Sequence, residues 1–190
     1  SIEEDYGDVV PWLEAAGFAP TILTPEDFVL VAEQMDSGTK RRFPVMLFGS
    51  SQLTSQQVTA IRSFVEDGGK LFVMTSAHSA ALYDDKFLPV LASWGLEVGP
   101  ELVLDISCFR ATFLSEDDNP VYEQVNYPLW IQALPQYTVD HPVSRRAFNL
   151  EFYWSSPITL TSMEAQALVY TTPSAWLSAP DFSKESVFIS

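Results

Sequence analysis

Basic residues are scarce in this sequence of 190 residues. Ten Lys and Arg stand against 25 Asp and Glu, which gives a formal net charge of −15 at pH 7. Because binding to duplex nucleic acid depends on Lys and Arg that displace counterions from phosphates, this balance argues against a nucleic-acid partner. Charged residues make up 18% of the chain and hydrophobic residues 47%, a composition outside the disordered range. We therefore expect a folded globular protein.

Sulfur and imidazole ligands are equally rare. Cys108 is the one cysteine, which excludes an internal disulfide and a zinc site built on several cysteines. The two histidines, His78 and His141, would need carboxylates from elsewhere to hold a metal, and no spacing points to such a set. The acidic runs lack the alternating acids and central glycine of a calcium loop, so we interpret them as solvated loops. These runs lie at residues 3–5, 84–85 and 116–118. The sequence predicts no metal site.

Glycine-rich phosphate cradles and long apolar runs are also missing. Neither GxGxxG nor GxxxxGKS/T occurs, so we predict no nucleotide and no other cofactor. No apolar run approaches the ~18 residues of a membrane-spanning helix, and the first residues lack the basic start and apolar middle of a signal peptide. Because the sequence opens almost directly on a predicted helix and ends on an apolar run, we expect a piece of a larger protein.

The first 95 residues alternate between helical periods and short apolar runs, the pattern of parallel strands joined by crossover helices. Apolar spacing predicts a helix over residues 9–16 that ends at Gly17, followed by a strand over 19–23. Thr24 before Pro25 predicts the start of a second helix, which ends near residues 36–38.

The clearest unit lies between residues 44 and 75. An apolar strand over 44–49 precedes a helix that begins in a Thr54–Gln57 capping box and ends at the glycine pair 68–69, and a second apolar strand follows. This order predicts a βαβ unit in which two adjacent parallel strands are covered by helices on either side. We therefore expect an α/β domain with a mainly parallel sheet.

The second half differs in character. A helical segment stops at Gly95, and strands are predicted at 96–98, 102–105, 157–160 and 166–172. Residues 109–157 combine several prolines with many aromatic residues and show no long helical period, so we interpret them as extended segments and ordered loops. We expect the aromatic side chains to form core for the most part, with one or two exposed. They are Tyr122, Tyr127, Trp130, Tyr137, Phe152, Tyr153 and Trp154.

Polar side chains follow both strands of the predicted βαβ unit. Ser50, Ser51 and Gln52 follow the first strand, and Ser76 and His78 follow the second. Because ligands of open parallel sheets bind outside the carboxyl ends of the strands, we expect these five residues to line a binding site for a small molecule of unknown identity.

Two alternatives come from other functional classes. Ser76 lies where a nucleophile elbow would place it, so a serine hydrolase or amidotransferase-like enzyme that uses Ser76 and His78 is the enzymatic alternative. The flanking glycines are missing, and a base two positions along the chain rarely reaches the hydroxyl, so we predict no catalytic residue. The other alternative is a structural domain whose aromatic second half docks on a partner protein.

Several segments resemble a known family. The segment FPVMLFGSSQLTSQQVTAIRSFVEDGGKLFVMTSAHS, at residues 43–79, is similar to the strand, helix and strand that follow one another in gliding-motility-type ABC transporter auxiliary proteins. Further similar segments follow in the order of the family, and the resemblance extends over roughly residues 17–176. They are WGLEVGPELVLD (94–105), YPLWIQALP (127–135), DHPVSRRAF (140–148) and LVYTTPSAW (168–176).

The resemblance implies a noncatalytic accessory or binding domain of an ABC-type transport system. Such a domain lies on the extracytoplasmic, periplasmic side of the cytoplasmic membrane, is anchored by a transmembrane segment outside this sequence, and works with an ABC-type permease and ATPase. The implied fold is a three-layer sandwich, flavodoxin-like or class I glutamine-amidotransferase-like, and a related module occurs in intraflagellar-transport proteins.

The family has no established catalytic residues. Ser76 stands where an amidotransferase has its cysteine, and Cys108 follows a different strand. We expect one α/β domain over residues 1–190.

Overall fold

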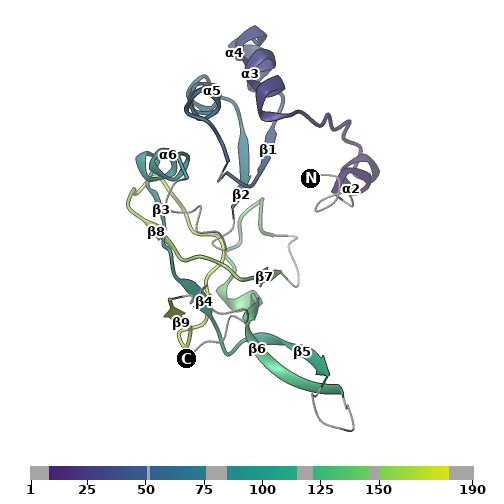
Figure 1. The fold of residues 1–190 in the computed structure, drawn as a ribbon, viewed down its shortest axis with the longest axis vertical. Coiled ribbons are helices and arrows are strands. Elements are labelled where there is room, and N and C mark those ends of the chain that lie inside the picture. Colours follow the sequence, from purple (N-terminus) through teal and green to yellow (C-terminus); the bar gives the residue numbers. More distant parts are fainter. Residues whose placement is uncertain (1–8, 51, 76–84, 115–121, 146–149, 180–190) are drawn as a thin grey trace. The chain divides into compact units, whose positions relative to one another are not determined.

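The computed structural model describes residues 9–50, 52–75, 85–114, 122–145 and 150–179 (Figure 1). The chain divides into two compact units. Unit 1 comprises residues 1–75 and 84–87, and unit 2 comprises residues 76–83 and 88–190. The single domain over residues 1–190 stays a prediction.

Unit 1 begins with three helices, α2 (Val9–Ala15), α3 (Pro25–Gln34) and α4 (Ser37–Lys40). The predicted start of α3 is confirmed, because the Thr24 hydroxyl caps the helix by accepting the Asp27 backbone N–H at 3.1 Å. The helix ends earlier than predicted, since Asp36 caps α4 instead, and its hydrogen bond from the Thr39 backbone N–H lowers the pKa of the Asp36 carboxyl. The strand predicted over residues 19–23 is wrong: this stretch has no ladder, and Pro20 offers no N–H to one.

The parallel pair and crossover helix of the predicted βαβ unit are confirmed, but the predicted cover of helices on both faces is not, because Met46, Phe72 and Met74 on one face of the pair are exposed. Strands β1 (Val45–Phe48) and β2 (Leu71–Met74) pair in parallel, and helix α5 (Ser55–Glu66) connects them (Figure 1). The capping box at the start of α5 is complete, because Thr54 and Gln57 exchange backbone-to-side-chain hydrogen bonds of 2.8 and 3.3 Å.

The core of unit 1 lies between α3 and α5. Phe28 meets Phe64 edge to face with ring centroids 5.7 Å apart, and Phe64 is 1% exposed. Gly69 leaves room for that ring, because a Cβ at Gly69 would lie 2.3 Å from a Phe64 ring atom. The other buried apolar residues here are Val29, Ala32, Leu53, Val58 and Ile61. The Phe28–Phe64 ring pair and these apolar side chains together pack α3 against α5.

The described part of unit 2 is mainly antiparallel β structure. After helix α6 (Leu88–Ser93), strand β3 pairs with β8, β4 with β9, and β6 with both β5 and β7. The bounds are β3 (Leu96–Val98), β4 (Leu102–Leu104), β5 (Cys108–Leu114), β6 (Tyr122–Gln132), β7 (Glu151–Tyr153), β8 (Ile158–Leu160), β9 (Trp176–Ser178) and the 3-10 helix η2 (Pro135–Tyr137).

The prediction of a three-layer sandwich with a mainly parallel sheet, flavodoxin-like or class I glutamine-amidotransferase-like, is therefore wrong. Within the described residues, β1 and β2 are the only parallel pair, and the other strands form small antiparallel sheets. The short link between β3 and β4 excludes one of the parallel pairs that such a sheet would need. Three residues join β3 to β4, whereas a parallel crossover needs about a dozen or more. The predicted strands at 96–98 and 102–105 exist, but each pairs with a strand from the end of the chain.

The core of unit 2 forms where β4 meets β6. Leu102, Leu104 and Leu129 are almost fully buried, and Tyr127, Trp130 and Trp154 pack against them with Leu88. The prediction that aromatic residues supply core is confirmed for these three, but the expected number of exposed rings was too low. Tyr122, Phe152 and Tyr153 are all exposed, because β7 and the start of β6 have no covering layer among the described residues.

Candidate functional site

The carboxyl ends of β1 and β2 bring hydroxyl groups together, as the sequence predicts. Ser50 follows β1, Thr75 follows β2, and their side-chain oxygens lie 3.1 Å apart. The parallel pairing of the strands causes this proximity, because it places both carboxyl ends at the same edge. Ser50 is only 2% exposed, and its hydroxyl also donates to the carboxylate of Asp85.

Asp85 is the member of this cluster that the sequence analysis missed. Residues 84–85 were predicted to be a solvated loop, and for Asp85 this is wrong, since its side chain is buried at 5% exposure. One oxygen accepts the Phe87 backbone N–H at 2.7 Å, and the other accepts the Ser50 hydroxyl. An Asx turn forms when an aspartate side chain accepts the backbone N–H of the residue two positions later. The sequence signal for such a turn was Asp85 placed two residues before the apolar Phe87.

The Ser50–Asp85 cluster is suited to holding structure in place rather than to reacting. A serine becomes a nucleophile when a base takes its proton and solvent or substrate can reach the oxygen. Ser50 is buried, and among the described residues its neighbours are a carboxylate and a second hydroxyl, with no imidazole in contact. The cluster therefore pins the loop after β1 to the residues around Asp85.

The other predicted site residues are placed only in part. Gln52 is exposed on the loop that follows Ser50. Ser51, Ser76 and His78 lie outside the described residues. The five-residue binding site at the strand ends thus stays a prediction, with Ser50 in the expected place and Gln52 accessible to a ligand.

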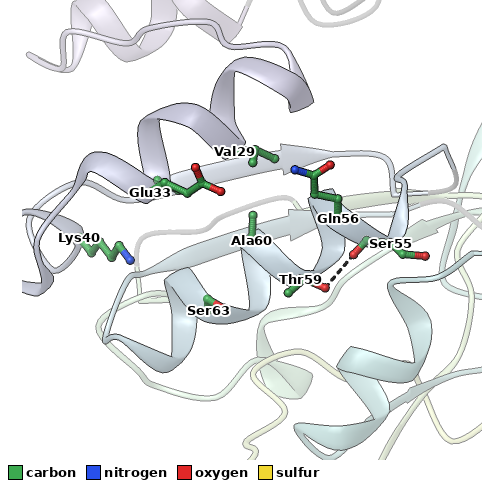
Figure 2. Close-up of a pocket in the computed structure, with 9 residues that line it drawn as sticks. Val29, Glu33, Lys40, Ser55, Gln56, Thr59, Ala60 and Ser63 are labelled. Atoms are coloured by element: carbon green, nitrogen blue, oxygen red, sulfur yellow. Dashed lines mark hydrogen bonds between the residues drawn. The ribbon is translucent and has the colours of Figure 1, made fainter.

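A groove of about 450 Å³ lies between α3 and α5, in a position that the sequence analysis did not single out (Figure 2). Its volume falls in the range of small-molecule sites. Lys40 borders the groove, but its ammonium is held by Asp67 at 2.6 Å. Short side chains four residues apart on α5, at Ser55, Thr59 and Ser63, leave the groove open. The further lining residues are Val29, Ala32, Glu33, Gln56 and Ala60.

Among the described residues of unit 2, the most buried polar side chain is that of Asp105, which is 0% exposed. Its carboxylate accepts the backbone N–H and the hydroxyl of Thr172, both at 2.7 Å, and the Ser107 backbone N–H at 3.0 Å. Every donor is a neutral group of the chain itself, and a carboxylate supplied with several hydrogen bonds can remain buried. Asp105 thus joins the end of β4 to a loop 67 residues away in sequence.

Cys108 lies near this carboxylate at the start of β5. Burial raises the pKa of the Cys108 thiol above its usual value, and the negative charge of Asp105 acts in the same direction. Because the thiolate is the nucleophilic form of cysteine, a raised pKa leaves Cys108 mostly protonated and weakly reactive at neutral pH.

Neither a metal-binding cluster nor a membrane-spanning helix occurs in the described part of the chain. No group of three or more His, Cys, Asp or Glu residues there is arranged to hold a metal ion. Nor does any helix there have the length and apolar character that crossing a membrane requires.

Comparison with known proteins identifies a structural neighbour and a family. A solved structure described as the mmIFT52 N-terminal domain matches with a TM-score of 0.53 and 15% identity, over 83% of this chain and 64% of that one. At this identity the match shows the fold alone, and that fold is not the predicted parallel three-layer sandwich. No curated protein matches the sequence.

The family match covers most of the sequence. The model of a family described as "ABC-type uncharacterized transport system" matches residues 21–186. This range includes the βαβ unit, the strand-end cluster of unit 1 and all the strands of unit 2. The family connects its members with the components of a transporter, and it supports the resemblance drawn from the sequence motifs. The chain belongs to this family of auxiliary components of ABC-type transport systems.

Proposed function

We propose that this chain is a noncatalytic accessory domain that works on the extracytoplasmic side of the cytoplasmic membrane with the permease and ATPase of an ABC-type transporter. The family match over residues 21–186 is the observation that carries the proposal. A membrane anchor outside this sequence holds the domain near the permease. Any small molecule that the domain takes up binds at the strand ends, beside Ser50, Ser51, Gln52, Ser76 and His78.

Two features of the described residues support a role without catalysis. Ser50 is buried and donates its hydroxyl to Asp85, so it offers no free nucleophile. Cys108 has a raised pKa, which disfavours its reactive thiolate. The enzymatic alternative would depend on Ser76 and His78, and no observation on the described residues favours it.

Co-purification tests the accessory role. When the full-length protein, with its anchor, is tagged and extracted from native membranes in mild detergent, we expect the permease and the ATPase to be retained with it. The matched control carries the same tag and anchor but lacks residues 21–186, the region of the family match. If the control retains both subunits as well as the full-length protein does, the domain does not contact the transporter and the proposal fails.

A fluorophosphonate probe tests the absence of catalysis, because it reacts with activated serines. We expect no labelling of the purified chain above the level of a heat-denatured sample. Ser76→Ala and Ser50→Ala variants should give the same background signal, since neither serine is expected to be activated. Labelling of the native chain that disappears in Ser76→Ala would show the hydrolase alternative to be correct.

A further inference from the structure

The amino-terminal ends of β1 and β2 gather positive charge in a chain whose net charge is −15. The Val45 backbone N–H donates to the Lys70 carbonyl at 2.8 Å, so the residues that lead into the two strands lie side by side. Arg41, Arg42 and Phe43 lead into β1 through Pro44, and Lys70 leads into β2. We call Arg41, Arg42, Phe43 and Lys70 the basic edge.

The charges of the basic edge are available to a partner. Arg41, Arg42 and Lys70 are exposed, and none of them forms an ion pair within the described residues. The acidic side chain at the end of the neighbouring helix, Asp67, is already neutralised by Lys40 at 2.6 Å. Within the described residues the edge therefore carries three cations that have no ion-pair partner.

Arg41 is held in position by the fold. Its side chain runs so close to the glycine at the end of α5 that a Cβ at Gly68 would lie 2.9 Å from the Arg41 Nε. The backbone of Gly68 has a φ of +93°, a conformation that L side chains rarely adopt. The carboxyl end of α5 carries a partial negative charge that favours a cation there. The Arg41 side chain thus packs at the carboxyl end of α5.

An exposed aromatic ring accompanies these cations. Phe43 is 57% exposed and directly follows Arg42. A ring beside Lys and Arg is suited to the membrane interface, where the ring enters the boundary between headgroups and acyl chains while the cations meet phosphates. An acidic protein surface would use the charges but would gain less from this ring. We propose that the basic edge docks on the headgroups of an anionic phospholipid membrane.

The net negative charge of the chain does not prevent this contact. At physiological ionic strength the Debye length is about 8 Å, so charges farther than that from the lipid are largely screened. The basic edge, once at the surface, interacts with the headgroups chiefly through its own three cations. Raising the salt further should weaken the binding, because the attraction between these cations and the anionic headgroups is then screened as well.

Sedimentation with vesicles tests the proposal on the chain as given. We expect the chain to bind vesicles of phosphatidylcholine in which about one lipid in three is the anionic phosphatidylglycerol. Binding to vesicles of pure phosphatidylcholine should be weaker. The double variant Arg42→Gln/Lys70→Gln should reduce the partition coefficient on anionic vesicles about thirty-fold, since each basic residue near the surface contributes about five-fold. Phe43→Ser should reduce it on the same vesicles. Arg41 is left intact because it packs at the end of α5.

A matched control removes the same charge elsewhere. Lys86 and Arg110 are both exposed and lie outside the basic edge, so Lys86→Gln/Arg110→Gln should keep the affinity for anionic vesicles. Equal losses in the two double variants would overturn the proposal, as would equal binding to neutral vesicles or none to either. If vesicles do not bind but Arg42→Gln/Lys70→Gln loses a co-purifying subunit, the edge docks on protein instead. The vesicles contain no transporter subunit, so their result is independent of the proposed accessory role.

Discussion

Asp105→Ala is expected to lower the free energy of unfolding of unit 2 by about 4 kcal/mol. The substitution removes a fully buried carboxylate and leaves three part-buried donors without this acceptor, namely both donors of Thr172 and the Ser107 backbone N–H. Each buried donor that loses its acceptor costs about 1–3 kcal/mol, and relaxation of the loop recovers part of the sum. Urea unfolding followed by tryptophan fluorescence measures the change, since Trp130 and Trp154 pack in the same unit.

The control for this variant is an aspartate that is paired at the surface. Asp140 bonds Arg145 at 2.9 Å, and both side chains are largely exposed. Because exposed ion pairs contribute about 0–1 kcal/mol, Asp140→Ala should change the free energy of unfolding only slightly. If Asp105→Ala were no more destabilising than Asp140→Ala, the connection between β4 and the Thr172 loop would not stabilise the unit.

Asp85→Ala is expected to destabilise unit 1 by about 3 kcal/mol. It removes the acceptor of the Phe87 backbone N–H and of the Ser50 hydroxyl, and both of these bonds are buried. The Ser50 hydroxyl keeps a second partner in Thr75, which is why we expect a smaller effect than at Asp105. Urea unfolding followed by far-UV circular dichroism measures the loss, because unit 1 supplies α3 and α5.

The neighbouring residue Lys86 provides the control. It is exposed, so Lys86→Ala should stay within about 0.5 kcal/mol of the original chain. Ser50→Ala should lie between the two, because it deletes one donor and leaves Asp85 with the Phe87 N–H. An Asp85→Ala variant as stable as Lys86→Ala would mean that the strand-end cluster is not a structural connection, and Asp85 would then be free to serve a ligand.

The two ends of the β1–β2 pair have different proposed roles. The carboxyl end carries the Ser50–Asp85 cluster and the predicted ligand site, and the amino end carries the basic edge. Four paired residues of about 3.3 Å each separate the two ends. A membrane docked at the basic edge would therefore leave the strand-end site of the same unit facing away from the lipid.

Local structure in unit 1 was predictable because local chemistry decides it. Thr24 and the Thr54–Gln57 box determine where two helices begin, since their side chains satisfy N–H groups within three residues. The apolar runs on either side of α5 predicted the parallel pair, because a helix of that length permits a crossover. The prediction of a strand over residues 19–23 was wrong because a strand also needs a neighbouring strand to pair with. An apolar run alone does not reveal whether one is present.

Of the candidate site, the place of Ser50 is the part that was predictable. Parallel strands place their carboxyl ends together, so Ser50 could be located at the strand ends. The burial of Asp85 depends on a contact across 35 residues, and an acidic pair in a polar stretch looks the same in sequence whether it is solvated or enclosed. The groove between α3 and α5 and the hydrogen bonds from Thr172 to Asp105 likewise depend on segments that approach each other only after folding.

The sequence by itself determined the helix caps, the parallel β1–β2 pair with its crossover helix, and the motifs by which the chain resembles its family. Tertiary structure alone decided the partners of the later strands and the enclosure of Asp85 and Asp105. The division has one physical cause: caps and helical periods are satisfied within a few residues, whereas antiparallel partners and buried carboxylates are satisfied by groups far along the chain.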